Sequence, residues 1–129
     1  MIRIGAVFVP VLNVEKAIHW YKEKLGLHHV GTWPENQGAD FYFMEQRQYL
    51  TLVRVLEKPP TTFPDSTNYQ NAYYNFTTTD IYSYHQELQQ KGVTVTDVEE
   101  HGPIIGFDFF DFEGNKFGVV VENKDFKKE

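Results

Sequence analysis

The sequence contains no cysteine, no long apolar stretch and no basic run before its last residues. The absence of cysteine excludes disulfides, thiolate metal sites and cysteine nucleophiles, and it fits a reducing compartment, with the cytoplasm as the default expectation. The longest apolar stretch, Ile4–Leu12, is interrupted by Gly5 and Pro10 and is too short to span a bilayer. No small-residue cleavage site follows it, so we interpret it as a strand and not as a signal peptide, and we expect no membrane association.

The charge balance is acidic, with 12 Lys and Arg against 18 Asp and Glu and a net charge of −6. Nucleic-acid binding normally leaves a basic footprint, so we exclude nucleic acid as a partner. Aromatic residues are frequent, at 16% of the 129 residues, and either a packed sheet or an aromatic-lined pocket would use them. The length and the 41% hydrophobic content are those of one globular domain.

Two stretches of the sequence share one pattern. Each has an extended run, a capping residue (Asn13 or Asp80), a helical stretch, a glycine stop (Gly26 or Gly92) and a new strand. The copies lie about half a chain length apart, which indicates a duplicated supersecondary unit within one domain. The two stretches are Val7–Leu27 and Tyr73–Val93.

These patterns predict an α+β fold of two tandem βαβββ modules, which form a cupped mixed sheet with the helices on its outer face. We expect a single domain over residues 1–129, with module one at about 1–58, a linker at about 59–71, module two at about 72–123 and a tail at 124–129. The linker holds three prolines and many polar residues and is expected to be a connecting loop, long enough to act as a lid or crossover. The expected strands are 2–9, 27–33, 41–44, 49–56, 72–78, 93–98, 107–110 and 116–122, with a turn at Glu45–Gln48.

The order and spacing of several short motifs resemble the vicinal oxygen chelate superfamily, which contains glyoxalase I, extradiol dioxygenases, fosfomycin-resistance enzymes and bleomycin-resistance proteins. The most specific of them is the Asp-x-x-Gly-Asn turn after two aromatic residues, in which Phe112 stands where the family usually has proline. The resemblance covers nearly the whole chain. It rests on Asn13–Ala17, Trp20–Tyr21, Leu25–Leu27, Thr79–Ile81, Leu88, Lys91–Val93 and Phe109–Asn115.

The resemblance also implies where a divalent metal would be held, because metal-dependent members carry one ligand on each of four cup-facing strands. The equivalent positions here are Ala6, Thr51, Tyr73 and Gly118. Their sequence neighbours are almost all apolar, as expected for a face that packs against helices, so alternation supports this register. Since alanine and glycine have no donor atoms and threonine is a poor ligand, we expect no metal and no other cofactor. This argues against the metal-dependent activities of the family.

The side chains expected to face the cup form an aromatic-rich surface with a few polar groups, which is typical of a small-molecule pocket. Either these rings stack on a planar ligand while Asn75 orients it, or they fill the cup themselves and leave no cavity. The predicted ligand-binding residues are Phe8, Trp33, Tyr49, Thr51, Tyr73, Asn75 and Lys116.

Catalytic residues remain unassigned by the sequence. His28 and His29 are adjacent on a strand, so they point to opposite faces and cannot chelate one ion together. His101, with Glu99 or Glu100, could form a relocated acid–base site.

Two functions are therefore compatible with the sequence. The first is a metal-free binder similar to bleomycin-resistance proteins, which sequesters a cationic or aromatic small molecule and forms a homodimer. The second is a glyoxalase-type lyase, isomerase or dioxygenase-related enzyme with a relocated or metal-independent site. A further alternative is an interaction module whose pocket has closed.

Overall fold

A computed structural model describes residues 1–43 and 46–127 of the chain, which divide into unit 1, Met1–Pro60, and unit 2, Thr61–Glu129. The predicted turn at Glu45–Gln48 and the predicted tail lie partly outside the described residues. No helix in the described part of the chain is long and apolar enough to cross a membrane.

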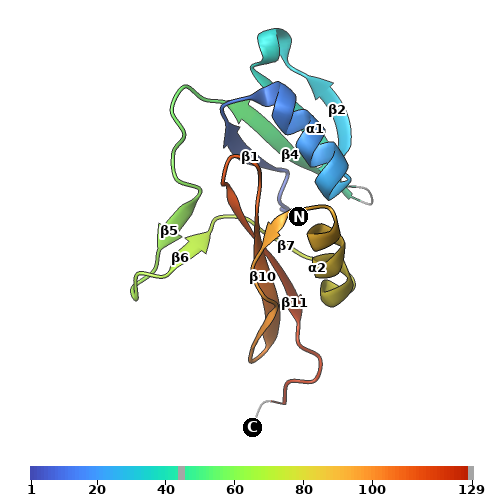
Figure 1. The fold of residues 1–129 in the computed structure, drawn as a ribbon, viewed down its shortest axis with the longest axis vertical. Helices are drawn as coiled ribbons and strands as arrows, with labels where there is room; N and C mark the ends of the chain where they lie inside the picture. The colour runs from blue at the N-terminus through green and yellow to red at the C-terminus, as the bar shows by residue number, and fades with distance from the viewer. Residues whose placement is uncertain (44–45, 128–129) are drawn as a thin grey trace. The chain divides into compact units, whose positions relative to one another are not determined.

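Unit 1 is a βαβββ module with one mixed sheet, and its helix lies against one face of that sheet (Figure 1). The strand order is β1-β4-β3-β2; β1 runs parallel to β4, and the other pairs are antiparallel. The elements are β1 (Ala6–Val11), α1 (Val14–Leu25), β2 (His28–Thr32), the 3-10 turn η1 (Pro34–Asn36), β3 (Gly38–Phe43) and β4 (Gln46–Arg54).

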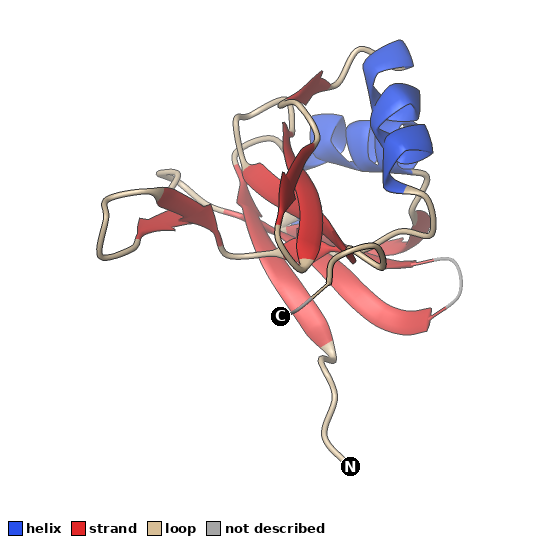
Figure 2. Ribbon diagram, turned by 90° about the horizontal axis from the view of Figure 1, so that it is seen from below, coloured by secondary structure: helices blue, strands red, loops and turns tan. Residues whose placement is uncertain are grey.

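Unit 2 repeats this module and adds strands to it. Its main sheet has the order β7-β11-β10-β8, with β9 also paired to β10, and a separate two-stranded hairpin, β5–β6, precedes it (Figure 2). The elements are β5 (Thr62–Pro64), β6 (Gln70–Ala72), β7 (Asn75–Phe76), α2 (Ile81–Gln90), β8 (Thr94–Val95), β9 (Glu99–His101), β10 (Ile104–Phe110) and β11 (Lys116–Glu122).

The predicted duplication is confirmed in both strand order and register. In unit 1, β1 pairs in parallel with β4, which lies between β1 and β3. In unit 2, β7 pairs in parallel with β11, which lies between β7 and β10. The pair Phe8–Thr51 in unit 1 corresponds to the pair Asn75–Gly118 in unit 2. In both pairs the two residues are separated by the same number of positions along the chain. The α+β class predicted from the sequence is therefore confirmed.

Both helices begin and end as their local sequence predicts. The Asn13 side chain accepts a hydrogen bond from the Lys16 amide at 3.0 Å, and the Asp80 side chain accepts one from the Ser83 amide at 3.1 Å. Gly26 ends α1 with a φ of 67°, a left-handed conformation that glycine adopts without steric strain.

The inner side of α2 is buried, and this desolvation, with a smaller contribution from the Glu87 carboxylate, raises the pKa of Tyr84 to about 12.

The core of each unit lies between its helix and the facing side of its sheet. Alternate residues of the strands are buried there, and the face predicted to pack against the helices, which includes Leu50, Leu52, Phe117 and Val119, is confirmed. The other face of each sheet carries the intervening residues, and we call it the open face. The buried apolar residues are Val9, Val11, Val14, Ala17, Tyr21, Leu27, Ala39, Phe41, Leu50 and Leu52 in unit 1, and Ile81, Leu88, Val93, Phe107, Phe109, Phe117 and Val119 in unit 2.

Several local predictions are wrong. The connecting segment 59–71 is not a plain loop, because most of the β5–β6 hairpin lies within it. The strand expected at 72–78 is reduced to Asn75–Phe76, and the first strand begins at Ala6 and extends to Val11. Finally, β9 was not expected; the Gly102–Pro103 turn folds it back onto β10, which begins at Ile104.

Candidate functional site

The open face of unit 1 carries an aromatic surface around one carboxylate. Strand pairing places Asp40, Thr51 and Phe8 side by side across β3, β4 and β1, and the next row contains Tyr42 and Tyr49. The two tyrosine rings meet edge to face, with centroids 6.2 Å apart. Phe8 is 57% exposed, so this surface has an accessible aromatic side chain beside the polar row.

Asp40 is held in place by two neutral donors. Trp33 Nε1 donates to Asp40 Oδ2 at 2.9 Å, and Thr51 Oγ1 donates to Asp40 Oδ1 at 2.8 Å. Thr51 is buried, whereas Asp40 and Trp33 are half-buried. The Trp33 ring lies directly over Gly38, where a Cβ atom would come within 2.7 Å of the ring. The glycine thus lets the indole lie on the open face and reach the carboxylate.

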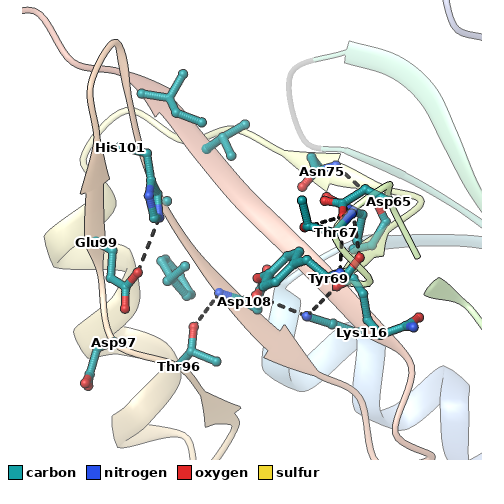
Figure 3. Close-up of a pocket in the computed structure, with 17 residues that line it drawn as sticks. Asp65, Thr67, Tyr69, Asn75, Thr96, Asp97, Glu99, His101, Asp108 and Lys116 are labelled. Atoms are coloured by element: carbon teal, nitrogen blue, oxygen red, sulfur yellow. Dashed lines mark hydrogen bonds and ion pairs between the residues drawn. The ribbon is translucent and has the colours of Figure 1, made fainter. Parts of the chain in front are cut away.

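Unit 2 contains a cavity of 690 Å³ between the β5–β6 hairpin and the open face of the main sheet (Figure 3). Four carboxylates line it, against one lysine and one histidine, so its charge is predominantly negative. A cavity of this charge attracts cations. The lining residues are Asp65, Thr67, Tyr69, Gln70, Asn71, Ala72, Asn75, Thr96, Asp97, Glu99, His101, Ile104, Gly106, Phe107, Asp108, Lys116 and Val120.

Lys116 joins the hairpin to the main sheet within this cavity. Its Nζ atom donates to the Gln70 carbonyl at 2.9 Å, lies 3.5 Å from Asp108 Oδ2 and sits 5.1 Å from the centre of the Tyr69 ring (Figure 3). The side chain is only 16% exposed. One ammonium group therefore contacts a carbonyl, a carboxylate and an aromatic face, which fixes the hairpin side of the cavity.

An imidazole and a carboxylate meet on another wall of the cavity. His101 Nε2 and Glu99 Oε2 are 3.4 Å apart on β9, and both side chains are largely exposed (Figure 3). A carboxylate beside an imidazole is the usual arrangement for orienting a proton-transfer group. The sequence-based hypothesis of an acid–base pair at these residues thus corresponds to two side chains that do meet.

The turn of the β5–β6 hairpin is organised by Asp65. Its Oδ1 atom accepts from the Thr67 hydroxyl at 2.6 Å, the Thr67 amide at 2.8 Å and the Tyr69 amide at 3.2 Å, and its Oδ2 atom accepts from Asn71 Nδ2 at 3.2 Å. These hydrogen bonds, with those from Thr67 contributing most, lower the pKa of Asp65 from 3.8 to about 2.

The hairpin should therefore loosen in acid. Because the pKa of Asp65 is lower in the folded state, its carboxylate stabilises the hairpin fully above pH 3.8, and this stabilisation is lost as the pH falls through about 2. We expect the amide resonances of Thr67 and Tyr69 to move toward random-coil positions over this window in an NMR titration. In Asp65→Asn the same amides should show no such transition; a transition of unchanged size in the variant would contradict the assignment.

The four positions that correspond to the family's metal ligands do not suit a metal ion. Ala6 and Thr51 lie on unit 1, where Thr51 donates to Asp40, and Tyr73 and Gly118 belong to unit 2. The side chain of Asn75 occupies the space that a Cβ atom on Gly118 would need. Within residues 1–43 and 46–127, no three His, Cys, Asp or Glu side chains form a group that could hold a metal. This set of donors therefore does not fit the metal that the resemblance implies.

Six of the seven predicted ligand-binding residues fall into two groups. Phe8, Tyr49 and Thr51 share the open face of unit 1, where Trp33 covers Gly38, and Asn75 and Lys116 line the cavity of unit 2. Tyr73 lies elsewhere: it is 57% exposed, and its ring packs 5.0 Å from that of Phe63 on β5.

Sequence reasoning missed Asp40 and Asp108. Each interrupts an otherwise apolar strand, at Ala39-Asp40-Phe41 and Phe107-Asp108-Phe109. A single acidic residue between buried neighbours must point to the other face of the sheet, and this signal could have identified both.

Comparison with known protein families gives one match over most of the chain. The model of the Glyoxalase/Bleomycin resistance protein/Dioxygenase superfamily matches residues 3–122. A comparison with curated protein sequences finds no match.

Solved structures with the same fold include proteins described in different ways. The antibiotic-binding protein TnmS3 from Streptomyces sp. CB03234 is 21% identical, with a TM-score of 0.77 and coverage of 95% of this chain and 98% of that one. A superfamily member from Sphaerobacter thermophilus DSM 20745 is 20% identical, with a TM-score of 0.75 and coverage of 93% and 97%. The lactoylglutathione lyase of Agrobacterium tumefaciens is 17% identical, with a TM-score of 0.70 and coverage of 92% of each chain. At these identities the similarity is one of fold.

Proposed function

Since the chain belongs to the Glyoxalase/Bleomycin resistance protein/Dioxygenase superfamily, we propose that it is a metal-free binder of a small cationic or aromatic molecule. The observation that carries this proposal is the cavity of unit 2, which combines four carboxylates with the ring of Tyr69. An aromatic cation suits such walls, because the carboxylates offset its charge and the Tyr69 ring can stack on one of its faces. The similarity in fold to a protein described as antibiotic-binding supports a small-molecule ligand.

The metal-free part of the proposal rests on Ala6 and Gly118. Neither residue can donate to a metal, and the space beside Gly118 is filled by Asn75. We also propose that the chain forms a homodimer, which light scattering coupled to size-exclusion chromatography would test.

Metal analysis and ligand screening test the proposal together. Protein purified without a histidine tag should contain almost no metal, before or after incubation with nickel, zinc and manganese. In a thermal-shift screen, aromatic cations, including the fluorescent dye thioflavin T, should raise the melting temperature of the protein. One tightly held ion per chain would instead restore a metal-dependent enzyme, and a screen in which no cation or neutral aromatic compound binds would overturn the proposal.

Lys116 offers a variant that is specific to the cavity. Lys116→Met removes the contacts to Gln70, Asp108 and Tyr69, and we expect the free energy of unfolding to fall by about 1–3 kcal/mol because Asp108 then lacks its partner. The affinity for the cation thioflavin T, measured by fluorescence titration, should rise by about tenfold, because the cavity loses a positive charge beside its carboxylates. The matched control is Lys91→Met, which removes the half-buried lysine at the C-cap of α2 that pairs with Glu87 outside the cavity. Equal effects of the two variants would contradict a role for the cavity.

A second candidate function, proton-transfer catalysis, is favoured by the contact between His101 and Glu99 in the same cavity. The two functions differ in one result: a binder returns its ligand unchanged, whereas an enzyme converts it in a reaction that His101→Gln abolishes, as followed by mass spectrometry.

A further inference from the structure

The duplication places an aspartate at the same point of both sheets. Asp40 lies on β3 opposite Thr51, which pairs with Phe8; Asp108 lies on β10 opposite Gly118, which pairs with Asn75. The two carboxylates therefore occupy equivalent positions on the open faces of their units. They differ in what surrounds them.

In unit 2 the carboxylate has a cationic partner in the chain itself, because Lys116 Nζ lies 3.5 Å from Asp108 Oδ2. In unit 1, Asp40 accepts from the indole of Trp33 and the hydroxyl of Thr51, and neither group carries a charge. Among the described residues, Asp40 forms no ion pair. A carboxylate that is fixed by neutral donors keeps its negative charge available for a ligand, and each of its oxygens retains a second lone pair.

The surroundings of Asp40 are aromatic. Trp33 lies beside it over Gly38, Phe8 follows Thr51 in the same row, and Tyr42 and Tyr49 form the next row. Aromatic faces around a fixed negative charge are the usual recognition surface for alkylammonium groups. A metal ion would instead require several oxygen or nitrogen donors that converge.

We propose that Asp40 anchors the cationic nitrogen of a quaternary ammonium or protonated amine on the open face of unit 1, with Trp33, Phe8 and Tyr49 as its aromatic contacts. This inference rests on the proposed function, because it assigns a charge contact for the same class of ligand. It adds a specificity-determining residue that the cavity of unit 2 does not contain.

The indole resonances of the chain provide a direct test. The chain has two tryptophans, and only the indole N–H of Trp33 donates to Asp40, so Trp20 serves as an internal reference. Choline is the probe, and 3,3-dimethyl-1-butanol is its uncharged isostere. In proton–nitrogen NMR spectra, choline should shift the Trp33 indole resonance in a saturable way, and the isostere should not.

The variant pair Asp40→Asn and Asp125→Asn then isolates the carboxylate. Asp125 lies in unit 2, is exposed and does not line the cavity, so its replacement removes one negative charge without touching the proposed site. We expect Asp40→Asn to weaken choline binding by about tenfold and Asp125→Asn to leave it within about twofold. Retained dispersion of the spectrum shows that each variant is folded.

Three outcomes would overturn the inference: no shift of the Trp33 resonance with choline, an equal shift with the isostere, or unchanged affinity in Asp40→Asn. The first two need only the natural chain, so they decide the question even if the variant fails to fold. The amides of Lys116 and Asp108 report the cavity of unit 2 in the same titration. Shifts there without a shift at Trp33 would reject the Asp40 site while supporting the proposed function, whereas a blank ligand screen rejects the proposed function itself.

Discussion

Replacement of Asp111 by alanine is expected to lower the free energy of unfolding by about 3–5 kcal/mol, the largest effect that we expect from a polar substitution in this chain. Asp111 Oδ1 accepts from the amides of Glu113 and Asn115, both at 2.9 Å, and Oδ2 accepts from Asn115 Nδ2 at 2.8 Å. Asp111 and Asn115 are buried, so alanine would remove the acceptor of three hydrogen bonds in a region that water reaches poorly. Urea unfolding followed by circular dichroism measures the change.

The neighbouring Phe112 supplies the control. It occupies the second position of the turn closed by the hydrogen bond from the Gly114 amide to the Asp111 carbonyl, at 3.0 Å, and proline is favoured there in such turns. Phe112→Pro should therefore raise stability, by about 0.4–1 kcal/mol, through the unfolded state. If Asp111→Ala changes stability by no more than Phe112→Pro does, the carboxylate is not what holds the turn.

The second large effect is expected at Gly38. A Cβ atom there would lie 2.5 Å from the Leu52 carbonyl oxygen and 2.7 Å from the Trp33 ring, so Gly38→Ala requires either the β4 backbone or the indole to move. We expect a loss of about 2–3 kcal/mol in the free energy of unfolding. Because the indole donates to Asp40, its displacement should also break that hydrogen bond and move the Trp33 indole resonance.

Gly31 is the matched control for this substitution. It lies on the adjacent strand β2, and a Cβ atom there would meet nothing within 4 Å. Gly31→Ala should leave both the stability and the Trp33 indole resonance close to those of the natural chain. A stability loss of equal size in both variants would show that the strands resist alanine generally, and that close approach of Trp33 to Gly38 is not the cause.

The parts of the fold that depend on local chemistry were predictable from sequence. The caps at Asn13 and Asp80 and the left-handed Gly26 act within a few residues, and so does strand alternation around Leu50 and Phe117. The β5–β6 hairpin was missed because both strands are only three residues long, β5 ends in a proline and β6 is largely polar, so neither shows the apolar alternation of a strand. The hydrogen bonds of Asp65 and the left-handed Asn68 make its turn, and these depend on geometry that composition does not reveal.

The candidate site was predictable only in part. Alternation identified which residues leave the helix side, and it therefore placed Phe8, Tyr49, Thr51 and Lys116 on the open faces of their sheets. It did not show that Asp40 is bound by Trp33 or that Asn75 fills the space beside Gly118, since both contacts join residues from different strands or loops. The family resemblance indicated Thr51 and Gly118 as ligand positions. The carboxylates of Asp40 and Asp108 lie opposite these two residues on the neighbouring strands.

The parallel pairing of first and last strands also bears on how the chain is made. Synthesis proceeds from the N-terminus, yet β4 and β11, the last strands of their units to leave the ribosome, occupy the interior of their sheets. Until β4 emerges, β1 and β3 present unpaired edges, which are the usual starting points for aggregation. Neither sheet can grow strand by strand in the order of translation. A polypeptide released before Lys116 would thus retain a complete first unit, whereas β7 and β10 would have no strand to join them.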